Sequence, residues 1–239
     1  MSADRLRFSA NTHVGHVRKL NEDSILALPD QNIWVVSDGM GGHAAGDYAS
    51  QMVVDCVAML SPDLAPAAKM QGMRDAIHRA HAAIRSEAEA RGGVTIGATV
   101  VSLVISNGHF AALWAGDSRL YRLQKGEIEL LTSDHSAVAE LVETGQMTWD
   151  EAEKHPQSNA ITRAVGVGDP LEIDKIRGEV FSGDRFLLCS DGLNKYAGFD
   201  LLEEVLKSEP IETITDRLTQ IALDGGGADN ISVVVVDVL

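Results

Sequence analysis

Three things are scarce in this sequence: cysteines, long apolar runs and basic residues. Its two cysteines, Cys56 and Cys189, are too few for a disulfide framework. It has no run of about 18 apolar residues, so we expect no transmembrane helix. Residues 1–5 lack the apolar core of a signal peptide. Together these absences predict a cytoplasmic protein that does not enter a membrane.

The shortage of basic residues gives the chain a strong negative charge. It has 20 Lys and Arg against 35 Asp and Glu, a formal net charge of −15. Proteins that bind nucleic acids usually present a basic surface, so we expect no nucleic-acid partner. Most of the carboxylates are expected to lie on a solvated surface. If some of them handle an anionic substrate, cations must stand between the two negative charges.

Linkers, internal repeats and low-complexity tracts are also missing, so we expect a single domain over residues 1–239. Short β-branched or apolar runs predict strands at 6–10, 24–28, 33–37, 98–105, 110–115, 120–123, 127–131, 171–177, 185–190 and 231–238. Apolar spacings of three and four predict helices at 45–60, 67–90, 201–206 and 211–223. Strands in hairpins and helices in pairs favour antiparallel sheets covered by helix pairs.

Glycines mark the expected turns. Asn107-Gly108 is a strong hairpin signal between two predicted strands. The glycine-rich stretch 38–42 is expected to be a turn between a strand and a helix. The polar segment 136–160 has no strong core pattern and is expected to form a surface flap. Trp34 and Trp114, both in predicted strands, are expected to lie in the core.

Acidic residues recur at the ends of predicted strands. Asp38 and Asp191 each follow a hydrophobic strand within the frame Ser-Asp-Gly. The whole set is Glu22, Asp23, Asp38, Asp117, Asp191 and Asp229. One such aspartate is usually a turn former or a helix cap, but that explanation is harder to extend to several. If the strand ends are neighbours, the like charges need protons or cations, and oxygen ligands favour Mg²⁺ or Mn²⁺ over Zn²⁺.

A cation cluster of this kind suits phosphate chemistry. Two cations about 4 Å apart can activate a water and bind phosphate oxygens. Arg18, five residues before Asp23, is placed to give a bidentate phosphate contact. The alternative for a single arginine is a surface ion pair. A cysteine nucleophile followed six residues on by arginine is absent, and so is a P-loop motif.

Several short motifs occur together in a fixed order. They are Arg18-x-x-Asn21-Glu22-Asp23, Val36-Ser37-Asp38-Gly39-Met40-Gly41-Gly42, Gly97-Ala98-Thr99, Ala115-Gly116-Asp117-Ser118-Arg119, Leu131-Thr132-x-Asp134-His135-Ser136, Ile161-Thr162-Arg163-Ala164-Val165-Gly166, Ser190-Asp191-Gly192-Leu193 and Asp229-Asn230-Ile231-Ser232. The sequence resembles the bacterial metal-dependent protein phosphatases of type 2C, the PPM family. The match runs from about Ser9 to Val238, nearly the whole chain.

The resemblance implies an α+β fold, a four-layer αββα sandwich of two antiparallel β-sheets flanked by helix pairs. It implies hydrolysis of phosphoserine and phosphothreonine by a metal-bridging water, with no covalent intermediate. The implied cofactors are two core Mn²⁺ or Mg²⁺ ions and a weaker third. The implied partners are phosphoprotein substrates, with a cognate Ser/Thr kinase and its targets.

The resemblance also assigns roles to residues. Asp38 would bridge the two core metals, and the Gly39 carbonyl would complete the ligands of one. Asp191 and Asp229 would bind the other core metal. Arg18 would hold the phosphate, so the implied catalytic residues are Asp38, Arg18 and Asp191.

The remaining implied roles lie around this core. Glu22 and Asp23 would act through metal-bound water, and Asp117 with Asp191 would hold the third ion. Many eukaryotic relatives have a histidine, thought to protonate the leaving group, where this chain has Met40. His43 is nearby in the sequence, but a metal-bound water is the favoured acid.

Two other readings stay open from the sequence. Gly39-x-Gly41-x-x-Ala44 resembles a dinucleotide-binding fingerprint. Two features argue against this reading. The negative charge of Asp38 would lie beside the pyrophosphate, and the ribose-binding acid should end a second strand, whereas Asp55 falls inside a predicted helix. A phosphoprotein-binding regulator with the same fold would be marked by missing metal ligands, and none is missing. His78 and His81, three apart on a helix, are expected to form a polar helix face and not a metal site.

Overall fold

The computed structural model describes residues 5–41, 45–148, 151, 155, 157 and 160–239. Its strands are β1 Leu6–His13, β2 Asp23–Leu28, β3 Ile33–Gly41, β4 Ile96–Ala98, β5 Val100–Ser106, β6 His109–Ala115, β7 Arg119–Gln124, β8 Glu127–Leu130, β9 Asp174–Glu179, β10 Arg185–Cys189 and β11 Ile231–Val238. Its helices are η1 Pro29–Gln31, α1 Gly46–Ala58, α2 Pro66–Ala90, α3 Ala137–Glu143, α5 Asp191–Asn194, α6 Phe199–Ser208 and α7 Ile214–Asp224. None of these helices has both the length and the apolar content of a membrane span.

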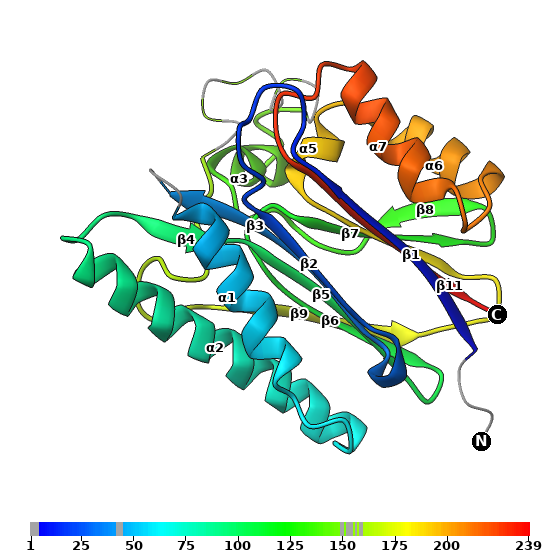
Figure 1. The fold of residues 1–239 in the computed structure, drawn as a ribbon. Helices are drawn as coiled ribbons and strands as arrows, with labels where there is room; N and C mark the ends of the chain where they lie inside the picture. The colour runs from blue at the N-terminus through cyan, green and yellow to red at the C-terminus, as the bar shows by residue number, and fades with distance from the viewer. Residues whose placement is uncertain (1–4, 42–44, 149–150, 152–154, 156, 158–159) are drawn as a thin grey trace.

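The strands form two antiparallel sheets packed face to face. One has the order β1-β11-β10-β7-β8, and the other has the order β2-β3-β5-β6-β9 with β4 paired to β3. Helices α1 and α2 cover the second sheet, and α6 and α7 cover the first (Figure 1). The expected four-layer αββα sandwich is therefore confirmed.

Each layer boundary has its own apolar cluster. Trp34 and Phe186 lie between the two sheets, where both side chains are buried. Val35, one residue along β3, faces the opposite way and packs beneath α1 and α2. This alternation follows from the two-residue period of a strand, and it explains why β3 is apolar on both faces. Trp114 also lies in the cluster between the sheets, so both tryptophans are in the core as expected.

The hairpin predicted at Asn107-Gly108 joins β5 to β6. Asn107 has φ 53° and Gly108 has φ 75°. Two successive positive φ angles are the signature of the tight hairpin turn that suits twisted strands. The single strand predicted at 98–105 is two strands, β4 and β5, interrupted at Thr99.

The turn expected at residues 38–42 is wrong for the part that the structure describes. Strand β3 continues to Gly41, with Asp38 opposite Asp23 on β2 and Gly39 opposite Ala98 on β4. The glycines concealed this pairing because they are poor strand formers in isolation. Here β4 supplies the missing hydrogen-bond partners. Asp38 is consequently held on a rigid strand and not in a turn.

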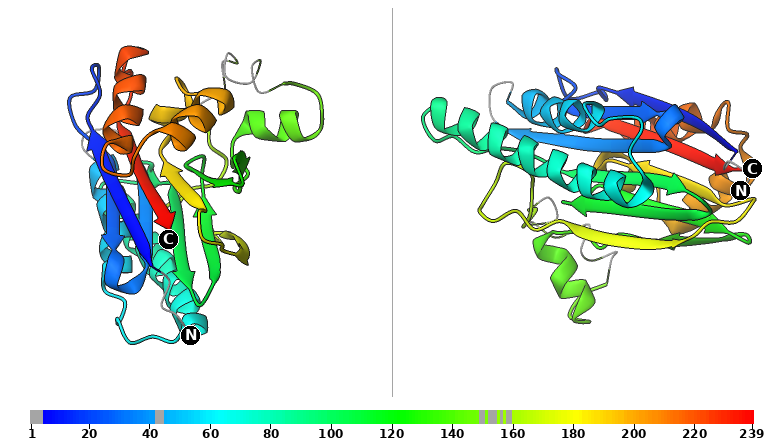
Figure 2. Two further views of the ribbon diagram at one scale, coloured as in Figure 1. Left: turned by 90° about the vertical axis from the view of Figure 1, so that its right-hand side faces the viewer. Right: turned by 90° about the horizontal axis from the view of Figure 1, so that it is seen from below.

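Other boundaries shift by a few residues. Helix α7 begins at Ile214 and not at 211, because the chain first turns at Pro210, whose carbonyl accepts from Thr213. Strand β9 begins at Asp174 and not at 171. Helix α3 stands outside the four layers (Figure 2), yet Val138 and Ala139 are buried, which the polar pattern of this segment did not predict. Within segment 136–160, residues 149–150, 152–154, 156 and 158–159 lie outside the described residues.

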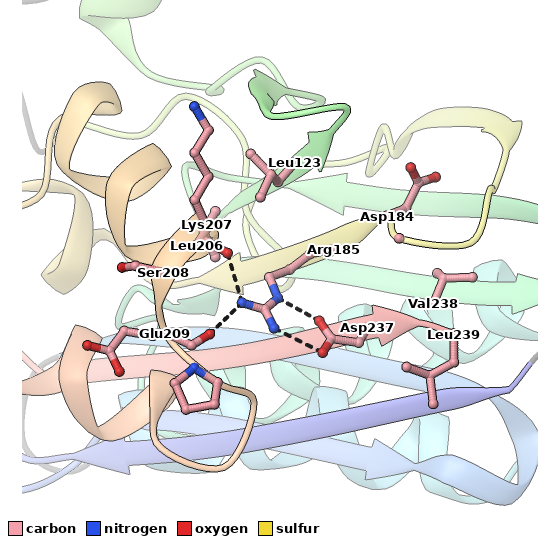
Figure 3. A pocket seen from close by; sticks show the side chains of 12 residues that line it. Leu123, Asp184, Arg185, Leu206, Lys207, Ser208, Glu209, Asp237, Val238 and Leu239 are labelled. Carbon is pink, nitrogen blue, oxygen red and sulfur yellow. Dashed lines mark hydrogen bonds and ion pairs between the residues drawn. The ribbon is translucent and has the colours of Figure 1, made fainter.

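A charged cluster joins the start of β10 to the end of β11. Arg185 makes a bidentate ion pair with Asp237, with Nε–Oδ1 at 2.6 Å and Nη2–Oδ2 at 2.9 Å. Its Nη1 donates to the carbonyls of Leu206 and Glu209, both at 2.8 Å, at the end of α6 (Figure 3). A hollow of about 460 Å³ opens beside these groups. The arginine is fully engaged within the protein, so this cluster ties α6 to its sheet.

Candidate active site

A pocket of about 240 Å³ opens at the other end of strands β10 and β11. It is lined by segments that are far apart in the sequence: the loop between β1 and β2, the end of β3, the turn after β6, helix α5 and the residues before β11. The lining residues are Arg18, Glu22, Asp38, Gly39, Met40, Gly41, Thr99, Asp117, Ile161, Asp191, Lys195, Asp229 and Asn230. The fold thus brings most of the strand-end carboxylates of the sequence to one place.

Asp23 and Asp38 are cross-strand neighbours on β2 and β3. Asp23 is buried behind Asp38, and its Oδ2 accepts a hydrogen bond from Ser190 Oγ at 2.8 Å, while its Oδ1 has no partner. Burial raises the pKa of Asp23 to about 7, against hydrogen bonds from Ser232 and Ser190 that lower it. Burial, followed by the charges of Asp23 and Asp191, raises the pKa of Asp38 well above its usual value. The pair is therefore costly to ionise without added positive charge.

Asp117 stands in the turn after β6, beside Thr99. Thr99 Oγ1 accepts from the Asp38 N–H at 2.9 Å and shares a hydrogen bond of 2.7 Å with Ser118. Thr99 therefore ties the Asp38 strand to the Asp117 turn. Burial, then the charges of Asp191 and Asp134, raises the pKa of Asp117 to about 8.

Asn230 fixes the loop that carries Arg18. Its Oδ1 accepts from the Glu22 N–H at 2.7 Å. Its Nδ2 donates to the carbonyls of Val14 and Leu20 at 2.9 and 3.0 Å. One amide side chain thus anchors both ends of the loop against the start of β11, which explains why an asparagine is needed beside Asp229.

Two cationic side chains reach the carboxylates. Arg18 binds Asp229 through Nε–Oδ1 at 2.8 Å and Nη2–Oδ2 at 2.9 Å. Lys195 Nζ lies 2.7 Å from Asp191 Oδ2 and 3.4 Å from Asp229 Oδ2. Burial would raise the pKa of Asp229, but the hydrogen bond from Arg18 and the charge of Lys195 outweigh it and hold this pKa below its usual value. Arg18 therefore contacts a carboxylate here.

The donor set fits a hard divalent ion. Gly46 has no side chain, and a Cβ there would lie 2.6 Å from Glu22 Oε1 and 2.8 Å from the Gly39 carbonyl oxygen. These two oxygens therefore share a small space at the start of α1. Asp191 Oδ1, like Asp23 Oδ1, is buried and has no hydrogen-bond partner among the residues that the structure describes. Carboxylate and carbonyl oxygens are the ligands that Mg²⁺ and Mn²⁺ prefer.

The described parts of the chain contain no group of three or more His, Cys, Asp or Glu side chains already arranged to hold a metal ion. The ion pairs give a physical reason, because Arg18 and Lys195 take up the oxygens of Asp229 and one oxygen of Asp191. A divalent ion at Asp229 would have to displace its contacts with Arg18 and Lys195. The fit of a divalent ion to this pocket therefore rests on the carboxylate and carbonyl donors and on the unpartnered oxygens of Asp23 and Asp191 among the described residues.

His135 connects the Asp117 turn to the surrounding loops. Its Nδ1 accepts from the Gly116 N–H at 3.1 Å, which places the ring proton on Nε2. Nε2 lies 3.2 Å from Asp174 Oδ2. Arg163 donates to the other oxygen of Asp174 at 2.9 Å. Burial lowers the pKa of His135, so the neutral ring that the turn requires is favoured.

A model of the protein phosphatase 2C family matches residues 12–231. This chain belongs to the protein phosphatase 2C family. It is 38% identical over 236 residues to the serine/threonine protein phosphatase PstP of Mycobacterium tuberculosis, covering 98% of this chain and 45% of the relative. The chain thus spans about half the length of that relative.

Solved structures of family members have the same fold. PppA, described as a key regulatory component of T6SS in Pseudomonas aeruginosa, matches with a TM-score of 0.92, 39% identity and full coverage of both chains. The catalytic domain of the phosphatase PstP, solved in complex with two manganese ions, matches with a TM-score of 0.89 and 35% identity over 98% of each chain. A dinucleotide-binding fold is wrong for this 2C-family chain, since β3 is antiparallel to both β2 and β5.

The structure gathers the site residues expected from the 2C-family resemblance. Those that line the pocket are Arg18, Glu22, Asp38, Gly39, Asp117, Asp191 and Asp229. Asp23 lies directly behind them. Their individual roles remain predictions.

Sequence reasoning gave no role to Lys195, Thr99 or Asn230. The signal for Lys195 was its spacing of four residues from Asp191, which brings the two side chains together once α5 is recognised as a helix. His43 lies outside the described residues. The expectation for His81 was wrong, because this side chain is buried and its Nδ1 accepts from the Gly166 N–H at 2.9 Å.

Proposed function

We propose that this chain is a metal-dependent serine/threonine protein phosphatase that uses Mn²⁺ or Mg²⁺ to hydrolyse phosphoserine and phosphothreonine. The observation that carries the proposal is the gathering of carboxylates from distant strand ends around one pocket. Membership of the 2C family supports it, as do the phosphatase names of the relatives and the two manganese ions of the PstP structure.

The proposed ligands follow from the lining of the pocket. Asp38 and the Gly39 carbonyl would hold one ion, with Asp38 shared by a second. Asp191 and Asp229 would complete the second ion. Such ions, when bound, would lower the pKa of a water and place positive charge beside the phosphoryl oxygens. The raised pKa values of Asp23, Asp38 and Asp117 are consistent with a site that is costly to leave ionised and uncompensated.

The protein's own groups have complementary tasks. Arg18, half-exposed at the pocket rim, would exchange Asp229 for a phosphate when an ion takes that carboxylate, because a guanidinium can bind either group through two parallel hydrogen bonds. Glu22 and Asp23 would accept hydrogen bonds from ordered water beside the ions. Met40 supplies no proton, so water is the proposed acid for the leaving alkoxide.

We also propose the setting in which the chain acts. Its substrates would be phosphoproteins, and a cognate Ser/Thr kinase would modify the same targets. The two cysteines are buried free thiols, which suits the reducing cytoplasm. Segment 136–160 is proposed as a flap that influences substrate choice, since Ile161 at its end lines the pocket.

Hydrolysis of a phosphothreonine peptide and a phosphotyrosine peptide of equal sequence tests the proposal. We expect release of phosphate from the first with added Mn²⁺, little from the second, and none from either after EDTA. Asp38→Asn serves as the control for contaminating phosphatase. Activity that survives EDTA, or that is equal in Asp38→Asn, would rule out the proposed mechanism. Stable binding of the peptide without turnover would favour the regulator instead.

A further inference from the structure

Lys195 is a cation built into the carboxylate cluster. It lies directly after α5, and its ammonium group is 2.7 Å from Asp191 Oδ2 and 3.4 Å from Asp229 Oδ2. Its charge also favours the ionised form of Asp117. About a third of the side chain is exposed, so the ammonium lies partly within the pocket wall. Lys195 thus contacts Asp191 and Asp229 and lines the same pocket as Asp117.

Lys195 contacts one of the two residues expected to hold a weak third ion, and it lines the same pocket as the other. The residues assigned to that ion are Asp117 and Asp191. Lys195 already forms an ion pair with Asp191, and its positive charge favours the ionised form of Asp117. A lysine side chain is ordinarily a cation at neutral pH, and the two carboxylate contacts of Lys195 favour the charged form.

Arg18 does not duplicate this contact. Its guanidinium binds Asp229 alone, from the opposite loop, and it is half-exposed at the rim. Divalent ions would displace Arg18 and Lys195 from Asp229 while Lys195 keeps Asp191 Oδ2, because the other oxygen of Asp191, Oδ1, is without a partner in the described parts of the chain. One carboxylate of Asp191 can therefore serve an ion and an ammonium at once.

We propose that Lys195 replaces the third divalent ion, so that this chain binds two ions and completes its charge balance with an ammonium group. The inference rests on the proposed function, since it assumes a core pair of ions. A charge of the same sign about 4 Å away weakens binding of a divalent ion by about tenfold or more. Removal of Lys195 is therefore expected to open the third position.

Counting bound Mn²⁺ tests the proposal without reference to turnover. Electron paramagnetic resonance of free aqueous Mn²⁺ during titration gives the number of ions bound per chain. We expect two ions for the wild type, three for Lys195→Met, and two for Lys195→Arg, which keeps the charge. The matched control is Lys207→Met, because Lys207 makes the same four-residue ion pair with Glu203 at 2.5 Å, but on α6. This control should bind two ions.

A second readout uses the metal-free protein. Lys195→Met should lower its Tm, because Asp191 and Asp229 lose their shared counter-charge, while excess Mn²⁺ should restore it. Three ions in the wild type, or two in Lys195→Met, would overturn the inference and leave the proposed phosphatase intact. No bound Mn²⁺ in the wild type would overturn both. If Lys195→Met does not fold, the number of Mn²⁺ ions bound by the wild type still tests the proposal.

Discussion

The two ends of strands β10 and β11 carry opposite electrostatic arrangements. At one end Asp237 pairs with Arg185 and, at 3.3 Å, with Arg7, and the remaining donor of Arg185 is used by backbone carbonyls. At the other end Asp191 and Asp229 face further carboxylates, and their contacts of opposite charge within the described residues are Arg18 and Lys195. The hollow at the balanced end has about 460 Å³ and that at the unbalanced end about 240 Å³. The candidate active site is therefore distinguished from the other hollow by its excess of negative charge and not by its volume.

The difference has a physical cause. A matched ion pair with all its hydrogen bonds made supports the fold, because removing one partner leaves the other charge uncompensated. A group of carboxylates that raise one another's pKa lowers stability until cations bind. The balanced end is therefore expected to matter for folding, and the unbalanced end for ligand binding and chemistry.

The largest expected effect is on turnover at the unbalanced end. Asp38→Asn should lower kcat/KM for a phosphothreonine peptide by at least about 1000-fold, because a shared metal ligand is lost. Circular dichroism should show an unchanged fold, since Asp38 makes its strand contacts through its backbone. Activity within tenfold of the wild type would contradict its proposed role.

At the balanced end, the expected effect is on stability. Asp237→Asn leaves Arg185 partly buried without a charged partner and should lower the free energy of unfolding by about 3 kcal/mol. The comparison variant Asp191→Asn should lower it by less than about 1 kcal/mol in metal-free protein, because its carboxylate neighbours gain from the lost charge. Urea unfolding measures both. Equal losses would remove the distinction between the two ends.

The pH dependence of the metal-free protein separates the two ends further. The pKa values of Asp23 and Asp117, about 7 and about 8, lie above those of the unfolded chain. Between about pH 4 and pH 8 the folded state therefore binds more protons, and these two groups lower stability as pH rises. We expect the free energy of unfolding to fall over this range, measured by urea unfolding in EDTA.

The double variant Asp23→Asn/Asp117→Asn is the control for this titration. It should show a flatter profile than the wild type, because two of the groups that take up protons are gone while Asp38 remains. Saturating Mn²⁺ should also flatten the wild-type profile. A wild-type profile no steeper than that of the double variant would show that these groups do not titrate as expected.

The smallest expected effect concerns His135, a positioning residue that joins the turn carrying Asp117 to Asp174 at the start of β9. His135→Ala removes the acceptor of the Gly116 N–H and should cost about 1 kcal/mol and a few-fold in kcat. His135→Asn offers an oxygen in place of Nδ1 and should recover most of kcat. If both variants lose kcat equally, the contact with Gly116 is not what positions Asp117.

Local pattern predicted most of the elements. The period of β3, the hairpin at Asn107-Gly108 and the stripes of α1 and α2 depend on neighbouring residues, and all appear in the structure. Longer-range pairing was not predicted: the match of β4 with Gly39, which extends β3, joins residues almost 60 positions apart. The pattern of neighbouring residues contains no information about a pairing partner so far away in the sequence.

The candidate site divides in the same way. The ordered motifs indicated which acids and which arginine to expect, because residues such as Asp38 and Asp191 stand in a recognisable strand-end frame. They did not indicate that Arg18 would bind Asp229, or that His135 would hold the Asp117 turn. These contacts depend on where loops from different sheets meet.

The sequence by itself determined the alternation of apolar residues, the strong negative charge and the placing of carboxylates at strand ends. Only the tertiary structure decided that these ends meet at one pocket and that Lys195 stands among them. The physical reason is range: periodicity and turn preference act over a few residues, whereas Coulomb interaction acts through space between groups that the fold has brought together.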